Sequence, residues 1–246
     1  MKISLISICR NSAATIQRCI DSVLQQKHKP QEYIFVEGQS EDRTLELLEE
    51  NLPQLGAASI ESRILIQKRI PGEAGIPSAW NQGLNAARGD IVALLNSDDW
   101  YEPDCLQKVH AGFVANPDIE ALVCPIHLHL TTGKQKLLAP RCLCLLPLLM
   151  PWPHPGSFFK ATAYRQLGLY DTRYSISADY DFIWRYHRSK LPWLALPEAL
   201  VHMEGGGFAN SNRSPARQET LAIARRHAPY SPLPYLAYAL RKLSGR

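Results

Sequence analysis

Short apolar runs alternate with amphipathic segments over the first hundred residues of the chain. The runs predict strands at 3–8, 33–36, 64–66 and 90–95. The three segments between them repeat apolar residues at intervals of three and four, as an amphipathic helix does. Strands that alternate with helices favour right-handed crossovers and a mostly parallel sheet. We therefore expect an α/β fold in which the strands end at one common edge.

The strand predicted at 90–95 leads directly into Asn96-Ser97-Asp98-Asp99. Ligands of open α/β sheets bind just outside the carboxyl ends of the strands, and two adjacent carboxylates there suit a divalent cation that bridges a diphosphate. Alternatively, Asp98 or Asp99 caps the following helix, since Pro103 stands near its first position. The stretch by itself predicts either a Mg²⁺ or Mn²⁺ site or an ordinary strand-to-helix turn.

The second half of the chain has a looser pattern. It predicts a helix at 103–114, an extended segment at 121–130, a helix at 178–188, and a helical tail that begins near 217, breaks at 229–234 and ends at 235–242. An apolar run at 142–155 contains four prolines and is shorter than the roughly 20 residues that a membrane helix needs. This run is either a buried connection or a segment whose Trp152 and His154 line the entrance for a substrate.

Composition and charge limit the classes of function. At 246 residues the chain is long enough for one large α/β domain. Its net charge of +4 is spread along the sequence, which argues weakly for anionic ligands and against a nucleic-acid groove; only 213–246 is locally basic. The six cysteines lack CxxC spacing, and the chain enters a strand at Met1–Leu5 without an export signal. We therefore expect a mature chain with reduced thiols in the cytoplasm.

Seven short motifs between the first strand and residue 207 carry a family resemblance. They are Ser7 to Asn11, Val36 to Thr44, Trp80 to Gly83, Arg88 to Asp90, Leu95 to Asp99, Ser177 to Phe182 and Gly205 to Gly207. In this order and spacing they resemble glycosyltransferase family 2, whose members have the GT-A fold. The resemblance implies one domain at 1–210 with a mostly parallel, Rossmann-like sheet flanked by helices, in which 1–100 binds a nucleotide-sugar donor and 101–210 the acceptor. The helical tail at 211–246 lies outside the resemblance.

The resemblance also implies which residues hold the donor. These are Ser7, Glu37, Asp42, Asn81, Asn96 and Asp98. Glu37 stands where the family usually has Asp, and its carboxylate could accept the N3–H of a uracil; local helix capping is the alternative for Glu37 and Asp42. The family's Asp-x-Asp metal motif is Asn96-Ser97-Asp98 here, so Asp98 is the first expected ligand of Mn²⁺ or Mg²⁺ and Asp99 the second.

An inverting transfer also needs a base that accepts the proton of the acceptor hydroxyl. Asp179 matches the second acid of the family's Glu-Asp motif, whose first acid is replaced by Ala178. Helical spacing places Asp179 on the same face as Phe182, whereas Asp181 points elsewhere. The positive end of the helix favours the ionised form of Asp179, which a base requires. The alternative is that both acids only complement the helix dipole.

The resemblance implies an inverting transfer of a sugar, from a donor expected to be UDP-linked, to a hydroxyl of a saccharide or lipid-linked acceptor in bacterial surface polysaccharide or glycolipid assembly. Trp152, His154 and His202 are candidate contacts of the acceptor or diphosphate, with structural roles as the alternative. A catalytically silent nucleotide-binding protein of the same fold is the rival, which Asn96 and Ala178 permit. A nucleotidyltransferase is disfavoured because 7–11 has neither glycine nor lysine.

The end of the tail mixes aromatic, apolar and basic residues. They are Tyr235, Leu236, Tyr238, Ala239, Leu240, Arg241, Lys242 and Arg246. Such a mixture suits an anionic membrane interface, so the tail either contacts the inner face of the membrane peripherally or packs on its own domain.

Overall fold

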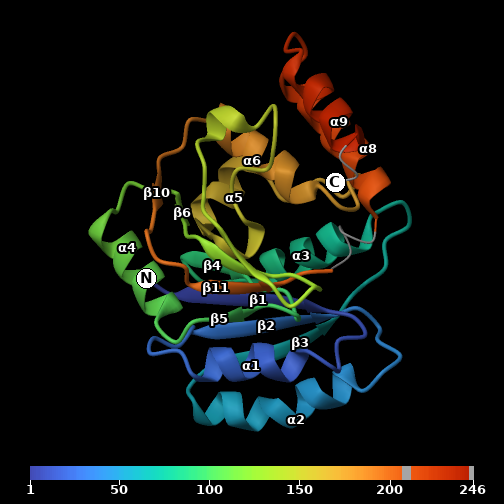
Figure 1. Cartoon of the computed structure of the whole chain (residues 1–246). Helices are drawn as coiled ribbons and strands as arrows, with labels where there is room; N and C mark the ends of the chain where they lie inside the picture. The colour runs from blue at the N-terminus through green and yellow to red at the C-terminus, as the bar shows by residue number, and fades with distance from the viewer. Residues whose placement is uncertain (207–211, 244–246) are drawn as a thin grey trace.

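The computed structural model describes residues 1–206 and 212–243, and Figure 1 shows the whole chain. Gly207 and Arg246, which two of the predictions above include, lie outside the described residues. Within the described residues, seven strands form one sheet in the order β10-β6-β9-β4-β1-β2-β3. Their bounds are β1 (Ile3–Cys9), β2 (Glu32–Glu37), β3 (Glu61–Ile66), β4 (Ile91–Leu94), β6 (Ala121–Val123), β9 (Ser157–Lys160) and β10 (Trp193–Ala195). The predicted α/β class is confirmed.

Helices cover both faces of this sheet. They are α1 (Ile16–Leu24), α2 (Thr44–Ala57), α3 (Gly75–Ala86), α4 (Cys105–Ala115), α5 (Ala161–Leu167) and α6 (Ala178–Arg188). The tail helices α8 (Arg213–His227) and α9 (Leu233–Leu243) pack on each other, and α8 packs on α6. Figure 1 shows α1 and α2 on one side of the sheet and α3, α5 and α6 on the other. Alternate residues of each central strand serve the two sides: Leu5 packs with the α1 layer, whereas Ile6 packs with the α3 layer. The near-continuous apolar strands of the sequence reflect this two-sided burial.

Strand β9 is antiparallel to its neighbours, and its direction determines which turn lies at the carboxyl edge of the sheet. It is antiparallel to β4 and β6, with Ala93 opposite Phe158, whereas β1, β2, β3 and β4 are mutually parallel. The start of β9 therefore lies beside the carboxyl end of β4. The short 3₁₀ turn η2 (His154–Gly156), which precedes β9, is thereby brought next to the residues that follow β4.

A smaller sheet continues from the same edge. Its strands, in spatial order, are β5 (Trp100–Tyr101), β11 (Val201–Glu204), β7 (Ile126–His129) and β8 (Gln135–Leu138). Strand β5 follows Asp99 immediately and pairs with β11, with His202 opposite Trp100. The end of β11 is thus fixed beside the stretch that follows the central strand.

The second half differs most from the predicted pattern. The extended segment expected at 121–130 is two strands, β6 and β7, which belong to different sheets. The apolar run at 142–155 contains η1 (Leu143–Leu145) and η2. The tail forms α8 and α9, and α8 begins four residues before the predicted start at 217. Among the described helices, none combines the length and apolarity needed to cross a membrane.

Candidate active site

The residues that follow β4 alternate between open and buried positions. Asn96, Asp98 and Trp100 are partly exposed, whereas Ser97 and Asp99 are buried. Residues 96–99 form a turn at the carboxyl edge of the sheet, in which the backbone N–H of Asp99 donates to the carbonyl of Asn96 at 3.1 Å. Burial raises the pKa of Asp98, and the nearby carboxylate of Glu204 adds to the rise.

Asp99 has a structural position. Its side chain is almost fully buried, and one carboxylate oxygen accepts the backbone N–H of Glu204 at 3.1 Å. The Asn96 amide donates to the other oxygen at 3.4 Å. Burial and the charge of Asp98 raise the pKa of Asp99 well above its ordinary value. This geometry does not support the predicted role of Asp99 as second metal ligand, because its oxygens hold β11 against the turn.

Glu204 is a residue of this edge that the motifs did not indicate. Arg18 binds its carboxylate at 2.9 Å, donates to the backbone oxygen of Asp98 at 3.0 Å and lies 3.7 Å from the ring centre of Trp100. The Glu204 carboxylate is close enough to Asp98 for its charge to raise the pKa of that carboxyl, and carboxylate oxygens are the ligands that hard divalent cations prefer. No group of three or more metal-binding side chains occurs in residues 1–206 and 212–243. The set fits Mg²⁺ or Mn²⁺ shared with a substrate phosphate, which completes the coordination.

Three predicted donor contacts hold the neighbouring loops instead. The hydroxyl of Ser7 is fully buried and bonds the Tyr33 hydroxyl at 2.9 Å and the Leu95 carbonyl at 2.5 Å. Glu37 accepts the backbone N–H groups of residues 39 and 40 at 2.9 and 2.8 Å. Asp42 is exposed and accepts the backbone N–H groups of residues 13 and 44, both at 3.0 Å. Asp42 bonds the first residue of α2, as the capping alternative expects, whereas Glu37 holds a turn that precedes α2 and is not a helix cap. Ser7 has no exposed surface for a nucleotide.

Asn81 is also a structural link. Its amide exchanges two hydrogen bonds of 2.9 Å with the backbone of Tyr170, which ties α3 to the segment after α5. The Tyr170 ring then lies 5.0 Å from the neighbouring Trp80 ring, and Trp80 stacks on His154 with ring centres 4.5 Å apart. The predicted donor contact of Asn81 is not supported, because both ends of its amide are occupied.

Trp152 and His154 differ in position although they are two residues apart. Trp152 is fully buried, with ring centres 5.0 Å from Trp193 and 5.3 Å from Tyr186, so it does not line an entrance. His154 lies at the sheet edge, and its Nε2 atom has no hydrogen-bond partner among the described residues. Burial lowers the pKa of His154 to about 4, which keeps the imidazole neutral at neutral pH.

His202 is engaged at both ring nitrogens. Its Nε2 meets Glu102 Oε1 at 2.7 Å, and its Nδ1 meets His129 Nε2 at 2.9 Å. The ring also stacks on Trp100, with the two planes 2° apart. The structural alternative therefore describes His202, which helps to hold the small sheet together.

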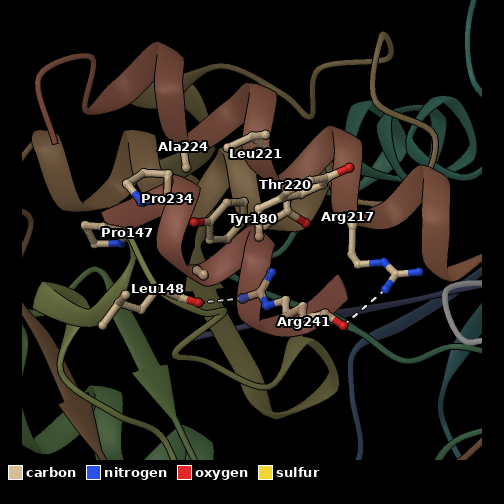
Figure 2. Close-up of a pocket in the computed structure, with 11 residues that line it drawn as sticks. Pro147, Leu148, Tyr180, Arg217, Thr220, Leu221, Ala224, Pro234 and Arg241 are labelled. Carbon is tan, nitrogen blue, oxygen red and sulfur yellow. Dashed lines mark hydrogen bonds between the residues drawn. The ribbon is translucent and has the colours of Figure 1, made fainter. Parts of the chain in front are cut away.

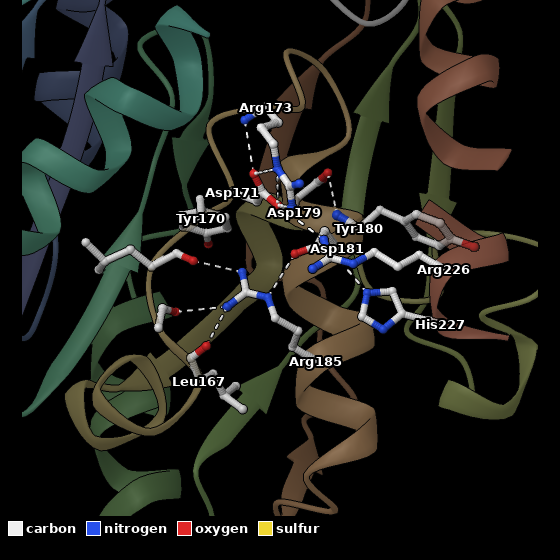
Figure 3. A network of polar contacts seen from close by, with 12 residues as sticks. Leu167, Tyr170, Asp171, Arg173, Asp179, Tyr180, Asp181, Arg185, Arg226 and His227 are labelled. Atoms are coloured by element: carbon white, nitrogen blue, oxygen red, sulfur yellow. Dashed lines mark hydrogen bonds and ion pairs between the residues drawn. The ribbon is translucent and has the colours of Figure 1, made fainter. Parts of the chain in front are cut away.

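Asp179 occupies the first turn of α6 (Figure 3). It is partly buried, and one carboxylate oxygen accepts the N–H of Tyr180 at 2.7 Å. No basic side chain of the described residues lies within ion-pair distance of it. Burial raises the pKa of Asp179 to about 6, and the carboxylate of Glu219 contributes to the rise. Burial is the main cause of the raised pKa of Tyr170, and the charge of Asp179 adds to it.

Asp181 has the opposite environment. It is 1% exposed and pairs with Arg185 at 2.8 Å and His227 at 3.0 Å. Burial alone would raise its pKa, but the hydrogen bond from His227 and the charge of Arg185 hold the pKa of Asp181 below its usual value. The two acids on one helical turn thus differ: Asp181 has an arginine and a histidine as partners, whereas Asp179 has no basic partner among the described residues.

Glu219 of α8 organises the segment that precedes Asp179. Its carboxylate accepts the backbone N–H groups of Ser175, Ile176 and Ser177 at 2.8–2.9 Å, and the Ser175 hydroxyl at 2.6 Å. This contact brings the tail into the site. No motif pointed to it, because the tail lies outside the family resemblance.

The sequence is similar to a family of known proteins over most of its length. A model of the glycosyl transferase family 2 matches residues 4–191. A PGL/p-HBAD biosynthesis glycosyltransferase of Mycobacterium bovis (strain BCG / Pasteur 1173P2) is 29% identical over 188 residues, which cover 73% of this chain and 67% of the relative.

Solved structures show the same fold. S. aureus TarS 1-349 in complex with UDP-GlcNAc is similar with a TM-score of 0.72 at 18% identity, over 94% of this chain and 68% of that one. The mannosyltransferase PcManGT of Pyrobaculum calidifontis, in complex with GDP-Man and Mn²⁺, is similar with a TM-score of 0.69 at 17% identity, over 96% and 69%. This chain covers 39% of a longer TarS chain. These similarities confirm the predicted GT-A fold.

Proposed function

Because the chain belongs to glycosyl transferase family 2, we propose that it moves a sugar from a nucleotide-sugar donor to an acceptor hydroxyl, with Asp179 as the base. The observation that carries this proposal is the state of Asp179: a partly buried carboxylate with a pKa of about 6 and no cation paired with it among the described residues. A base works best when its pKa lies near the working pH, because it is then ionised and still basic enough to take a proton.

On the donor side, we assign Asp98 and Glu204 to the ion, Mn²⁺ or Mg²⁺, that the donor diphosphate would share. When bound, the ion neutralises the charge of the departing diphosphate. Asn96 is partly exposed in the same turn as Asp98, and its amide, which donates one hydrogen bond to Asp99, can donate a second to a phosphate or ribose oxygen. The complexes of TarS with UDP-GlcNAc and of PcManGT with GDP-Man support a nucleotide-sugar donor, and we favour a UDP-linked one.

On the acceptor side, Asp179 takes the proton of the attacking hydroxyl while that oxygen bonds to the anomeric carbon and the bond to the diphosphate breaks. Direct attack inverts the configuration at that carbon. The rings of Trp80, Tyr170 and the neutral His154 form one cluster, and His154, whose Nε2 has no partner among the described residues, lies in the turn before β9, beside the carboxyl end of β4. We assign His154 to a hydrogen bond with the acceptor or with the diphosphate.

The acceptor class rests on the similarity to the mycobacterial glycolipid relative and on the charge of the tail. We propose a saccharide or a lipid-linked saccharide, made at the cytoplasmic side of a membrane. In this scheme 1–100 binds the donor, 101–210 binds the acceptor, and the tail at 211–246 supports the base through Glu219.

The first experiment is a screen of nucleotide sugars by thermal shift, with and without Mn²⁺. A ligand at 100 times its Kd stabilises the folded state by about 2.7 kcal/mol, so the bound donor should raise Tm, and only in the presence of the ion. Release of the free nucleotide is then measured with that donor. The assay is repeated with each member of a panel of saccharide acceptors. If the donor binds but no acceptor causes release of the nucleotide, the result would favour the catalytically silent alternative and contradict the proposed transfer.

A further inference from the structure

The outer face of α9 is apolar and open. Leu233, Leu236, Leu240 and Leu243, here called the leucine face, are 38%, 51%, 56% and 86% exposed. Their spacing of three, four and three residues places them along one side of the helix. Tyr235 on α9 and Tyr230 just before it are 49% and 98% exposed. Exposed large apolar residues in one continuous stripe mark an interaction surface more often than isolated ones do.

The opposite side of α9 is fixed to the body of the protein, so the leucine face has a defined orientation. Pro234 and Ala237 are buried and, with Tyr180 of α6, line a pocket between α9, α6 and α8 (Figure 2). Arg241 donates to the carbonyl of Leu148 at 2.6 Å, which ties the last turn of α9 to the loop before β9. Helix α9 is therefore attached to the body of the protein, and its leucines have a fixed orientation on the surface.

The charge of α8 and α9 indicates which kind of surface the leucine face would bind. Residues 212–243 hold six arginines and lysines and one acid, Glu219, a net charge of +5 against +4 for the whole chain. The positive charge of the protein is thus concentrated in α8 and α9, while the remainder is close to neutral. An apolar stripe on a basic helical hairpin is complementary to an anionic lipid surface, where leucines enter the acyl boundary and cations meet the headgroups.

We propose that the leucine face binds peripherally to the surface of an anionic lipid bilayer. The same hairpin carries Glu219, which holds the segment before Asp179, so binding would bring the base close to the plane in which a lipid-linked acceptor lies. That consequence rests on the proposed function. The binding itself does not, and it can be measured without donor or acceptor.

The test is flotation of the full chain with vesicles of 30% phosphatidylglycerol and 70% phosphatidylcholine. The wild type should float with these vesicles. It should float much less with pure phosphatidylcholine, which has no net charge, or in 0.5 M NaCl, which screens the attraction between the basic residues and the anionic headgroups. Leu236→Ser/Leu240→Ser should reduce the partition coefficient by about tenfold or more. Lys242→Gln should reduce it by about fivefold.

A matched control exists on the small sheet. Leu137 and Leu138 of β8 are 62% and 38% exposed, so Leu137→Ser/Leu138→Ser makes the same chemical change away from α9 and should float like the wild type. Circular dichroism and Tm establish that each variant is folded. Equal flotation of the wild type and the α9 variant, or no flotation of the wild type, would overturn the proposal.

Two further measurements distinguish lipid binding from dimerisation and from the proposed sugar transfer. Sedimentation velocity without lipid tests a second copy of the chain as the occupant: a wild-type dimer that Leu236→Ser/Leu240→Ser converts to a monomer would overturn lipid binding as the role of the face. Transfer to a water-soluble acceptor should be unchanged in the same variant, because the leucine face is not part of the catalytic groups. Loss of flotation with retained transfer supports the proposal, whereas a protein that floats but transfers no sugar refutes only the proposed function.

Discussion

Replacement of Asp179 by asparagine should make the protein inactive and, at neutral pH, more stable. The amide keeps the size of the side chain but cannot accept a proton, so turnover should fall by about 10²–10⁴-fold. The gain in stability has a separate origin. Burial raises the pKa of Asp179 from 3.8 to about 6, so ionisation of this carboxyl is more costly in the folded chain than in the unfolded one.

The magnitude of the stability change follows from the pKa. A rise from 3.8 to about 6 corresponds to at most about 3 kcal/mol, at 1.36 kcal/mol per pH unit. Because the side chain is partly exposed, we expect a change of about 1–3 kcal/mol, or a Tm higher by about 3–8 °C. Wild-type stability should decrease as the pH rises from about 4 to 6 and then stay level. Asp179→Asn should lack this decrease, so the two proteins should be equally stable near pH 4.

The same carboxylate sets the pH dependence of the reaction. If its ionised form is the base, the wild-type rate should rise about tenfold between pH 5 and pH 7, with a midpoint near 6. The groups around it are Glu219 and Tyr170, whereas Arg173 and Arg226 pair with Asp171. Initial rates of nucleotide release across pH 4.5–8, together with thermal melts at the same pH values, measure both effects on one set of samples.

Asp181 provides the contrast on the same helical turn. Asp181→Asn leaves Arg185 and His227 without their buried partner and should cost about 3–5 kcal/mol of stability, with activity per folded molecule retained. The two isosteric changes should therefore differ in both properties: one inactive and stabilised, the other active and destabilised. A near-normal rate for Asp179→Asn, or a lower Tm for it than for wild type at pH 7, would refute the assignment of the base.

Asp98→Ala should remove the Mn²⁺ dependence of UDP binding in isothermal titration calorimetry without unfolding the protein, and unchanged Mn²⁺-dependent affinity would contradict its role as a ligand. Glu219→Gln should move the midpoint of the pH–rate profile to lower pH, because the charge of Glu219 helps to raise the pKa of Asp179; a midpoint that stays in place would show that the two are not coupled. An α-linked donor should give a β-linked product in NMR coupling constants, and an α product would exclude direct attack.

The parts of the fold that the sequence predicts best are those whose signal is local. The strand–helix units from β1 to β4 follow the apolar pattern, because each strand is a continuous apolar run and each helix between them is long enough to show its period. Strands of two to four residues, such as β5, β9 and β11, show no period of their own and are defined by pairing with distant segments. The antiparallel direction of β9, which brings His154 to the site, is a property of that long-range pairing.

In the candidate site, too, the features with a local sequence signal can be predicted and those that depend on distant segments cannot. The sequence does not separate Asp98 from Asp99, because Asp99 is buried by its hydrogen bond with the backbone N–H of Glu204, which lies 105 residues further along the chain. Glu37 and Asp42 accept backbone N–H groups two or three residues further along the chain, and such turn geometry is encoded locally. Glu204 and Glu219 could not be found in this way, because each acts on a segment that is far away in the sequence.

Helix α8 explains why the two acids of α6 differ. His227, near its end, pairs with Asp181 and with Arg185 lowers the pKa of that carboxyl, while Glu219, two turns earlier, faces the segment before Asp179 and helps to raise the pKa of the other. A pair of carboxyls whose environments move their pKa values apart is the arrangement that assigns one of them to proton transfer and the other to structure. The tail, which no family motif covers, therefore adds to the difference between the two acids: Glu219 adds to the effect of burial on Asp179, and His227 adds to that of Arg185 on Asp181.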